Sequence, residues 1–331
     1  MKVLVTGANG FLSGHIIREL LKRGHSVRAM MRAGAKAPAL TGLDIDVFYG
    51  NITNKTDIEN AVDGCEIVIH AAADTSQSHR KAEDYFPVNV HATAHIIEAM
   101  KHRGCKRLIF VSTANAMGFG TIENPGNEKT PASPLILKSG YAKSKFMAQN
   151  LVLEAVKNQN LDAVVVNPTF MIGPLDYNPH SGRIFRMIMN KKLVFYPPGG
   201  KNFVDVRDAA SGIVNAITDG KSGECYLIAG ENLSYRDFFQ KIKLLTKQSS
   251  KLVQIPVLLL KLAGIFGSIC QYLGINTELT FANTRILSVN NYFDNSKAVR
   301  CLGLLCSGMD KTITDYLKWL KGKDLGKKIP G

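Results

Sequence analysis

The chain opens with KVLVTGANGFLSGHIIRELLKR (residues 2–23), in which an apolar strand leads through a glycine-rich turn into an amphipathic helix. Gly7 allows a tight turn, and Gly10 lets backbone N–H groups approach a pyrophosphate at the N-terminus of the helix. Because strand, turn and helix follow one another, the pattern predicts a dinucleotide-binding loop rather than an ordinary glycine-rich turn. Ser13 stands where a third glycine or alanine is usual, but this position serves helix–strand packing rather than phosphate contact. We therefore expect the loop to bind its cofactor.

The first half of the chain alternates Val- and Ile-rich runs with helical stretches. Apolar runs without polar alternation are typical of strands that are buried on both faces of a parallel sheet. Strands and helices in strict alternation predict a doubly wound α/β fold of the Rossmann type. The predicted strands are 2–7, 26–32, 44–50, 65–73, 107–113 and 161–168, and helices are predicted at 14–23, 55–63, 84–103 and 141–158.

This alternation ends after residue 168. Proline and glycine interrupt residues 168–200, a short strand and a helix return at 203–217, and the remainder is mostly helical. The mixture predicts a smaller second lobe, interleaved with the first, that closes over the carboxyl edge of the sheet. We predict a Rossmann NAD(P)-binding domain at 1–168, to which 202–221 returns, and a substrate lobe formed by 169–201 and 222–331.

The 331 residues are 45% hydrophobic and carry a formal net charge of +14. The hydrophobic share excludes a disordered chain. Lys and Arg are scattered and accompany no helix-turn-helix or aromatic–basic platform, so we expect no nucleic-acid partner. An anionic cofactor, an anionic substrate or a membrane surface would account for the charge instead. The six cysteines form no C-x-x-C pair and no signal peptide precedes the first strand, so we expect reduced thiols and a cytoplasmic location.

The eight histidines are dispersed along the chain, and we expect no metal site. His91 and His95 lie four residues apart on a predicted helix, but no third ligand accompanies them. His70, within VIHAAA, is more typical of a hydrogen-bonded core residue than of a catalyst.

The region after the second predicted strand bears on the choice of cofactor. Folds of this type that bind NAD(H) place a carboxylate there, on the 2′-hydroxyl of the ribose. No Asp or Glu occurs from Leu20 to Leu43, whereas Arg28, Arg32 and Lys36 do. A guanidinium can bind a 2′-phosphate bidentately, so we expect NADP(H) to be preferred, with NAD(H) possible, and assign the phosphate to Arg32. A solvated basic surface is the alternative, above all for Arg28 and Lys36.

Tyr141 and Lys145 lie four residues apart on a predicted helix and therefore share one of its faces. A phenol has a reference pKa of about 10. A neighbouring ammonium favours the phenolate, so we expect Lys145 to bring the pKa of Tyr141 toward the working pH. Thr113, at the end of a predicted strand, can hydrogen-bond the same substrate oxygen. The Y-x-x-x-K spacing alone is common on amphipathic helices, and only its combination with Thr113 and the glycine-rich loop indicates catalysis.

Together these segments resemble the extended short-chain dehydrogenases/reductases, also called the NAD-dependent epimerase/dehydratase family. The resemblance extends from residue 2 to about residue 235 in the family's order. The region NPTFMIGPLDYNPHSGRI and the tail that begins IPVLLLKLAG are most similar to the dihydroflavonol-4-reductase-like subgroup. The matching stretches are TGANGFLSGH, VIHAAA, VNVHATAHIIEAM, FVSTANAMG, YAKSK, VVNPTFMIGP, FVDVRDAASGIVNAI and YLIAGENLS.

The resemblance implies a role for each catalytic position. Tyr141 would be the general acid/base, and Lys145 its electrostatic partner and a ribose ligand. Thr113 would donate a hydrogen bond to the substrate oxygen, and Asn89 would support a proton-relay water. Asn51 stands where the family commonly has an adenine-contacting aspartate, and its amide oxygen can still accept from the adenine amino group. The implied cofactor contacts are Gly7, Asn9, Gly10, Phe11, Leu12, Arg32, Asn51, Ile52, Ala71, Ala72, Ala73, Tyr141, Lys145 and Pro168.

The apolar segment IPVLLLKLAGIFGSICQYLGI (255–275) is interrupted by Lys261 and Gln271, which disfavour a membrane span. We expect the segment to be buried or to line an apolar substrate pocket, and peripheral membrane contact is the less favoured alternative. Aromatic and methionine residues between 170 and 187 also favour an apolar cavity.

The sequence thus predicts an NADP(H)-dependent oxidoreductase that interconverts a ketone or aldehyde and an alcohol on a fairly apolar small molecule. Two alternatives stay open: a nucleotide-sugar epimerase or dehydratase with tightly bound NAD, and a redox-inert nucleotide-binding sensor. The presence of Thr113, Tyr141 and Lys145 disfavours the sensor, and the missing carboxylate after the second strand disfavours tightly bound NAD. The resemblance also raises the possibility of a homodimer built on the helix that contains Tyr141.

Overall fold

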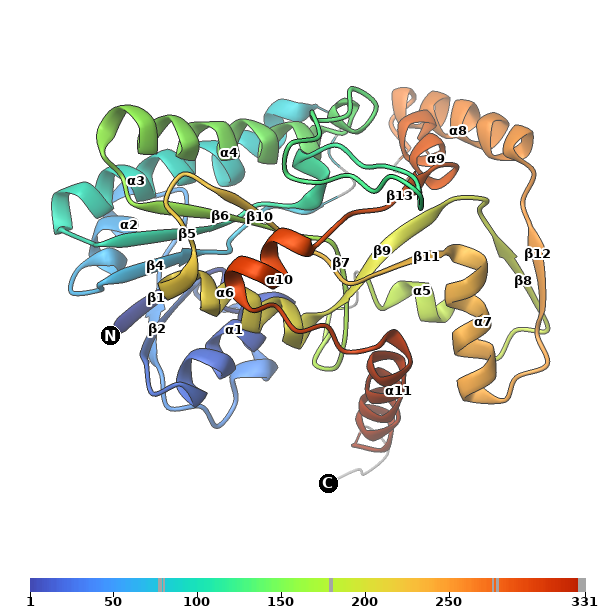
Figure 1. Ribbon diagram of the computed structural model, residues 1–331, viewed down its shortest axis with the longest axis horizontal. Helices are drawn as coiled ribbons and strands as arrows, with labels where there is room; N and C mark the ends of the chain where they lie inside the picture. Colours follow the sequence, from blue (N-terminus) through green and yellow to red (C-terminus); the bar gives the residue numbers. More distant parts are fainter. Residues whose placement is uncertain (77–78, 80, 179–180, 276, 278–279, 327–331) are drawn as a thin grey trace.

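The computed structural model describes residues 1–76, 79, 81–178, 181–275, 277 and 280–326, and Figure 1 shows their arrangement. Seven parallel strands form the main sheet in the order β10-β6-β5-β4-β1-β2-β3. This order contains the 3-2-1-4-5-6 arrangement of a doubly wound Rossmann sheet, which confirms the predicted fold class. The strands are β1 (Lys2–Thr6), β2 (Ser26–Met31), β3 (Asp46–Tyr49), β4 (Ile67–His70), β5 (Arg107–Val111), β6 (Ala163–Pro168) and β10 (Cys225–Ile228).

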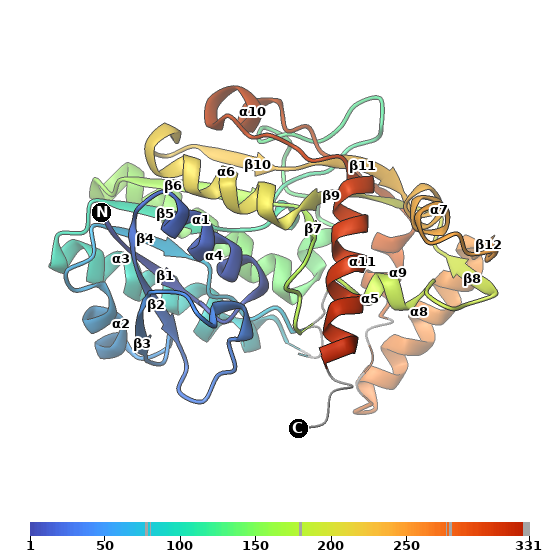
Figure 2. The ribbon, with the colours of Figure 1, turned by 90° about the horizontal axis from the view of Figure 1, so that it is seen from below.

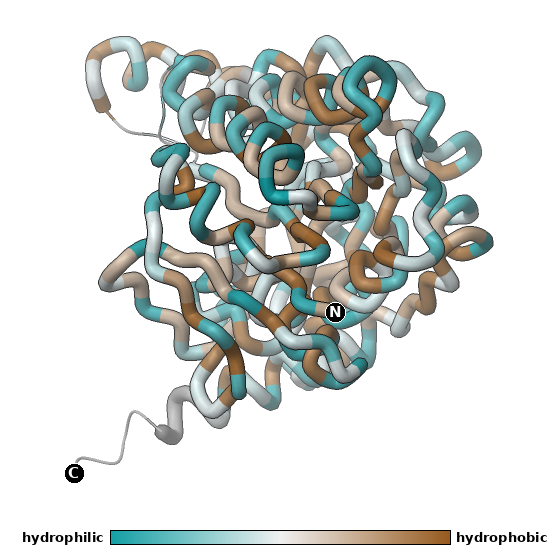
Figure 3. Tube along the Cα trace, turned by 90° about the vertical axis from the view of Figure 1, so that its left-hand side faces the viewer, coloured by the Kyte–Doolittle hydropathy of each residue, from teal (hydrophilic) through white to brown (hydrophobic). Residues whose placement is uncertain are grey.

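Helices cover both faces of the main sheet, because successive residues of a strand point to opposite faces. On one face, Val3 and Val5 pack with the helices α1 (Phe11–Lys22) and α6 (Val206–Asp219). On the other face, Leu4 packs with three helices, which are α2 (Lys55–Val62), α3 (Ala92–Arg103) and α4 (Gly140–Gln159). Figure 3 views this end of the molecule and shows hydrophilic and hydrophobic residues alternating along the outer helices, as expected where each helix buries one stripe.

The smaller lobe is built on two short sheets and an aromatic core. Stacked rings of Phe203 and Phe238, with centroids 4.2 Å apart, lie in this core. The first sheet contains β7 (Phe170–Ile172), β9 (Gly200–Asp205), β11 (Glu231–Ser234) and β13 (Asn290–Asn291), and the second contains β8 (Leu193–Tyr196) and β12 (Lys251–Gln254). The helices are α5 (Arg183–Arg186), α7 (Tyr235–Thr246), α8 (Val257–Tyr272), α9 (Phe281–Leu287) and α11 (Met309–Gly326), while α10 (Ser296–Leu302) packs back against α6 and β10.

All six predicted strands are present in the main sheet. The range predicted as a helix, 84–103, is helical throughout, but the α-helix α3 begins only at Ala92. Pro87, which has no backbone N–H, begins a π-helical turn that leads directly into α3. The short helical turns are η1 (Pro38–Leu40), η2 (Ala82–Tyr85), η3 (Pro87–His91), η4 (Ala114–Ala116) and η5 (Ile136–Lys138).

The sheet topology corrects the predicted division of the chain at two strands. β10 lies within 222–331, which we assigned to the substrate lobe, but it is the edge strand of the main sheet and pairs with β6. β9 overlaps 202–221, which we assigned to the Rossmann domain, but it belongs to the smaller lobe. Both strands are short runs with apolar, buried residues, so their composition does not reveal which sheet they join. Only α6 of the returning segment packs against the main sheet.

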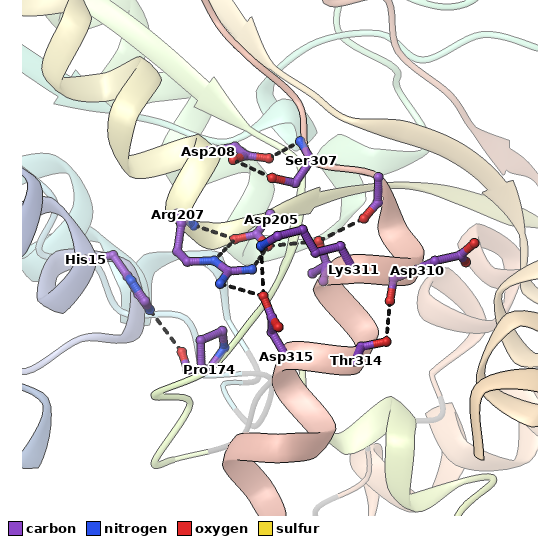
Figure 4. Close-up of polar contacts among 12 residues, drawn as sticks. His15, Pro174, Asp205, Arg207, Asp208, Ser307, Asp310, Lys311, Thr314 and Asp315 are labelled. Carbon is purple, nitrogen blue, oxygen red and sulfur yellow. Dashed lines mark hydrogen bonds and ion pairs between the residues drawn. The ribbon is translucent and has the colours of Figure 1, made fainter.

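A polar cluster joins α11 to the junction of β9 and α6 (Figure 4). Asp205 accepts hydrogen bonds from Arg207 Nη2 at 2.6 Å and from Thr312 Oγ1 at 2.8 Å. Arg207 Nη1 donates in turn to Asp315 of α11 at 2.8 Å. Burial alone would raise the pKa of Asp205, but the bonds from Arg207 and Thr312 lower it, so the carboxylate stays charged. The cluster fixes the C-terminal helix across the smaller lobe.

The segment 255–275 is largely exposed rather than buried, and its predicted part in lining a substrate pocket stays a prediction. Helix α8 packs one narrow stripe, formed by Leu260, Gly264 and Gly267, and most of its other side chains are exposed. The reason is its place at the end of the smaller lobe away from the main sheet, where α9 is its main neighbour (Figure 1 and Figure 2). Within the described residues, no helix is both long enough and apolar enough to cross a membrane.

Candidate functional site

The residues predicted to bind the cofactor and the substrate follow neighbouring strands of the main sheet. The glycine-rich loop follows β1, Ala71–Ala73 follow β4, Thr113 follows β5, and Pro168 ends β6. These four strands are parallel neighbours, so their carboxyl ends meet at one edge. Doubly wound folds bind their ligands in the crevice outside this edge.

The geometry of the loop explains its two glycines. Gly7 has a φ of +65°, which favours glycine, and a Cβ at this position would lie 2.7 Å from Ala72 Cα. The Gly10 N–H donates to Gly7 O at 2.9 Å, and a Cβ at Gly10 would lie 3.1 Å from the same oxygen. Ser13 is almost fully buried, as its predicted packing role requires. The loop is a tight turn that lies directly against the chain after β4.

The N-terminus of α1 fits the diphosphate of an NAD(P) cofactor. Among the described residues, no side chain caps this helix, and its first turn contains no acidic residue. The backbone N–H groups of Phe11 and Leu12 have no acceptor inside the helix and, together with the helix dipole, favour an anion. Asn9 is half-buried in the same turn. The loop therefore presents the backbone donors that a pyrophosphate requires.

The basic residues after β2 differ in their surroundings. Arg32 is exposed just past the end of β2. Arg28 is instead held within the protein, since its Nε donates to Asp46 at 2.8 Å and its Nη1 to Asp63 O at 2.8 Å. Arg28 thus stabilises the contact of β2 with β3 and the end of α2, and Arg32 stays the better assignment for a 2′-phosphate.

Asn51 departs from the expected arrangement. Its amide oxygen accepts hydrogen bonds from Thr53 N at 3.1 Å and from Thr53 Oγ1 at 3.0 Å. These bonds occupy the oxygen that we expected to accept from adenine, because a side-chain amide readily closes a local turn onto the residue two positions on. The adenine contacts assigned to Asn51 and Ile52 stay predictions.

Tyr141 lies in the first turn of α4 and is half-buried. Its ring centroid is 6.3 Å from that of Tyr85, in an edge-on arrangement. Burial raises the pKa of Tyr141 to about 12, whereas the interaction with the Thr113 side chain lowers it and Tyr85 raises it. The phenol is therefore protonated in the protein alone, with the Thr113 hydroxyl as a neighbour.

Lys145 lies one turn further along α4 and is 1% exposed. Its Nζ donates to Val111 O at 2.7 Å and lies 4.4 Å from the centroid of the Phe110 ring. Burial lowers the pKa of Lys145 to about 7. Our expectation that Lys145 lowers the pKa of Tyr141 stays a prediction. Burial is the largest influence on both groups, and it favours the neutral form of each.

Asn89 is buried and its side chain is engaged by the protein. Its Oδ1 accepts from Asp74 N at 2.8 Å, and its Nδ2 donates to Asp74 O at 3.0 Å and to Ser144 Oγ at 2.9 Å. Its backbone carbonyl accepts from Thr93 Oγ1 at 2.8 Å. Asn89 thus holds the segment after Ala73 against α4, and its role in supporting a proton-relay water stays a prediction.

Two buried polar residues that the sequence reasoning did not single out support the catalytic strand ends. Asn167 Nδ2 donates to Thr113 O at 2.9 Å and to Gln149 Oε1 at 2.8 Å. Asn167 lies in β6 and Gln149 on α4, so the pair connects three elements of the site. The sequence does mark Asn167, because it is a single asparagine that directly follows the apolar run AVVV of a buried strand.

The chain leaves the main sheet at Pro168, which is buried, and then enters β7 of the smaller lobe. The ring of Phe170 in β7 lies beneath Lys201 of β9, with 4.9 Å between Nζ and the ring centroid. Burial lowers the pKa of Lys201 to about 8. Lys201 was also missed from the sequence, where a single lysine in a strand carries no distinguishing pattern.

His70 is a buried, hydrogen-bonded core residue, as predicted. Its Nδ1 lies 2.8 Å from Thr6 Oγ1 and its Nε2 lies 3.2 Å from Thr93 Oγ1. Burial lowers the pKa of His70 to about 3, so the imidazole is neutral. In the part of the chain that the structure describes, no group of three His, Cys, Asp or Glu side chains could hold a metal ion.

Three features lie at one edge of the main sheet. They are a nucleotide-binding turn, a half-buried tyrosine, and a buried lysine one helical turn after the tyrosine. They indicate an NAD(P)-binding enzyme of the short-chain dehydrogenase/reductase type. Residues 3–229 match the NAD dependent epimerase/dehydratase family, and the chain belongs to this family.

Comparison with individual proteins gives distant relatives along the whole chain. The Synechocystis sp. protein named "Putative dihydroflavonol 4-reductase" is 30% identical over 325 residues, 96% of this chain and 94% of its own. The Methylococcus capsulatus protein named "Sterol demethylase protein B" is 28% identical over 330 residues, 98% of this chain and all of its own. The crystal structure of gox2253 superimposes with a TM-score of 0.85 at 27% identity, and covers 97% of this chain and 98% of its own.

Proposed function

We propose that the protein is an NADP(H)-dependent oxidoreductase that interconverts a ketone or aldehyde and an alcohol on an apolar small molecule. One observation carries this proposal. Thr113 at the end of β5 and Tyr141 at the start of α4 come close together because α4 packs against η4, the turn that begins directly after Thr113, and the Thr113 side chain lowers the pKa of the Tyr141 phenol. Lys145 is anchored on Val111 O, two residues before Thr113. A substrate oxygen at this place would meet two hydroxyl donors at the edge where the cofactor loop lies.

The chemistry of these side chains suits proton transfer to and from a carbonyl oxygen. When bound, the nicotinamide ring supplies the hydride to the carbonyl carbon or accepts it from the alcohol. A phenol with a pKa near 12 stays protonated until a stronger base, the alkoxide, develops beside it, so Tyr141 is the proton donor in reduction. Thr113 holds the oxygen in line with that proton. Lys145, with a pKa near 7, can take up a proton near neutral pH and favour the phenolate that remains.

An apolar substrate is supported by the surroundings of the site and by the relatives. Tyr85 packs edge-on against Tyr141, and Phe170 follows Pro168 at the entrance to the smaller lobe. Two of the relatives carry names that refer to a sterol and to a dihydroflavonol. Both names refer to compounds built on fused rings.

The preference for NADP(H) rests on Arg32. It is exposed at the sheet edge, and no carboxylate occurs between residues 20 and 43 to hold the ribose diol. A charge-assisted contact with phosphate contributes about 1.5 kcal/mol at an exposed site, or about tenfold in affinity. Arg32→Ala should remove most of this preference by weakening NADPH, while Lys22→Ala on α1 serves as a matched loss of one exposed positive charge.

A cofactor-oxidation screen tests the proposal. The purified chain is incubated with NADPH or NADH and with steroid ketones, flavonoid-like carbonyls, simple ketones and nucleotide sugars. We expect oxidation of NADPH with at least one apolar ketone. Conversion of a nucleotide sugar without net consumption of cofactor would contradict the proposal and support the epimerase or dehydratase alternative.

A further inference from the structure

Helix α8 presents an unusually apolar outer face. Leu260, Gly264 and Gly267 form its buried stripe, and a Cβ at Gly264 would lie 3.0 Å from Phe281 Cα of α9, so the two helices cross closely. At 100° per residue, most of the other large apolar side chains fall on the opposite side, over an arc of about 140°, whereas Val257 lies nearer the buried stripe. The side chains of this arc are between 48% and 88% exposed, and they are Leu258, Leu259, Leu262, Ile265, Phe266, Ile269, Tyr272 and Leu273.

A surface of this kind is rare on a monomeric protein in water. Single exposed apolar residues are common, but contiguous apolar patches mark contacts with another protein or with lipid. The helix has 16 residues and is therefore about 24 Å long, whereas a bilayer core is about 30 Å thick. A helix of this length lies along an interface rather than across it.

The charge around α8 favours a membrane surface over other occupants. No Asp or Glu occurs from Phe238 to Thr277. The exposed basic side chains of the helix pair are Lys261 on α8 and Arg285 on α9, and among the described residues neither forms an ion pair. Lys191, Lys192 and Lys251 are also exposed, at the beginning of the strands β8 and β12, and the far end of β12 leads into α8. Anionic lipids attract such clusters, and the whole chain has a net charge of +14.

The position of α8 relates this face to the proposed active site. α9 packs against α8 on one side and against η5 on another. η5 ends at Lys138, and α4 begins two residues later at Gly140, directly before Tyr141. The apolar helix pair therefore adjoins the segment that positions the catalytic tyrosine.

We propose that the exposed face of α8 binds the surface of a lipid bilayer that contains anionic headgroups, and that this contact brings the active site to apolar substrates dissolved in the bilayer. The inference rests on the proposed function in one respect, since it takes the substrate to be apolar. The apolar arc enters the acyl region, and the lysines around it contact the headgroups.

Vesicle flotation of the full chain tests the inference. The vesicles are phosphatidylcholine alone or phosphatidylcholine with about one third phosphatidylglycerol. We expect flotation with the anionic vesicles, weaker flotation with the neutral ones, and a decrease as salt rises from about 0.1 M to about 0.5 M. Leu262→Ser with Phe266→Ser should reduce the partition coefficient by about tenfold or more, because it removes two large apolar side chains from the middle of the helix.

A matched control separates this face from general surface stickiness. Val299→Ser with Leu305→Ser also removes two exposed apolar side chains, but from α10 and the chain after it, and should leave flotation unchanged. Equal flotation of both double variants and the unmutated chain would overturn the inference. So would sedimentation, without vesicles, of a dimer that the α8 variant dissociates, since a second copy would then cover the face.

The inference and the proposed function fail in distinguishable ways. Reduction of a water-soluble ketone by NADPH in the absence of vesicles reports the proposed function alone, and the α8 variant should retain it. A chain that reduces the ketone but does not float refutes only the membrane contact. A chain that floats but oxidises no cofactor with any ketone refutes the proposed function.

Discussion

Asn167 should be essential both for stability and for the position of Thr113. Its amide group makes two hydrogen bonds, to Thr113 O at 2.9 Å and to Gln149 Oε1 at 2.8 Å, in a fully buried place. Thr113 O can only accept, so the amide nitrogen must face it. Asn167→Ala leaves both acceptors without a donor and opens a small cavity. At about 1–1.5 kcal/mol for each lost bond, the free energy of unfolding should fall by about 2–3 kcal/mol.

Asn167→Asp provides a sharper test because it keeps the volume and changes only the donor. The carboxylate would oppose two oxygen acceptors in a buried place, so its pKa should rise above the value in the unfolded chain. A group with a raised pKa in the folded state costs more stability as pH rises. The variant should therefore be less destabilised, relative to the unmutated protein, at pH 5 than at pH 8.

Urea unfolding followed by circular dichroism measures these differences, and Asn158→Ala, at an exposed position on the same α4, serves as the control. Turnover adds a second readout. A displaced Thr113 should lower kcat by about tenfold for a loss of about 1.4 kcal/mol, while the affinity for NADPH is retained. Unfolding free energies within about 0.5 kcal/mol of the unmutated protein for both Asn167 variants would refute the reasoning.

Three further predictions concern the loop, the catalytic pair and the core histidine. Ser13→Gly should leave NADPH affinity nearly unchanged in a fluorescence titration. Gly10→Val should abolish binding, because the valine side chain would crowd Gly7 O and the phosphate site. A large gain in NADPH affinity for Ser13→Gly would contradict this prediction. Tyr141→Phe should lose about 10²–10⁴-fold in kcat and keep its affinity for cofactor, whereas Lys145→Met should weaken both, as steady-state kinetics and titration will show. The pKa of His70 is about 3 in the folded protein and 6.5 ordinarily, so the neutral imidazole stabilises the fold fully above pH 6.5 and this stabilisation is lost as pH falls toward 3. His70→Gln should therefore make the free energy of urea unfolding less dependent on pH in this window, by about 1.4 kcal/mol per pH unit. An unchanged slope would contradict this prediction.

The sequence predicted the main sheet well because local pattern and global structure agree there. Val3, Leu4 and Val5 are buried on two faces, so every residue of the run must be apolar, and the run is visible without alignment. Gly7 is equally visible, since its positive φ and its approach to Ala72 both require glycine. The loop and the Tyr141–Lys145 spacing follow from the same local rules.

The parts that the sequence did not predict depend on contacts between distant segments. The strands β9 and β10 are short, and their sheet is set by pairing with β7 and β6 rather than by their own composition. Asn167 takes its role from Thr113, 54 positions away in the chain. The apolar helix α8 was expected to be buried or to line a pocket. Its burial depends on how many other elements pack against it, and the sequence of 255–275 contains no information about those neighbours.

The central claim is that hydride passes between NADPH and a carbonyl carbon with net consumption of cofactor while Tyr141 supplies the proton. The most direct test uses NADPH with deuterium at both C4 positions of the nicotinamide and the ketone that is reduced fastest in the cofactor-oxidation screen. Mass spectrometry should find one deuterium on the carbinol carbon of the product for each NADPH oxidised, and Tyr141→Phe should form this product about 10²–10⁴-fold more slowly. A product without deuterium, or an isomerised substrate with the cofactor unchanged, would contradict the claim.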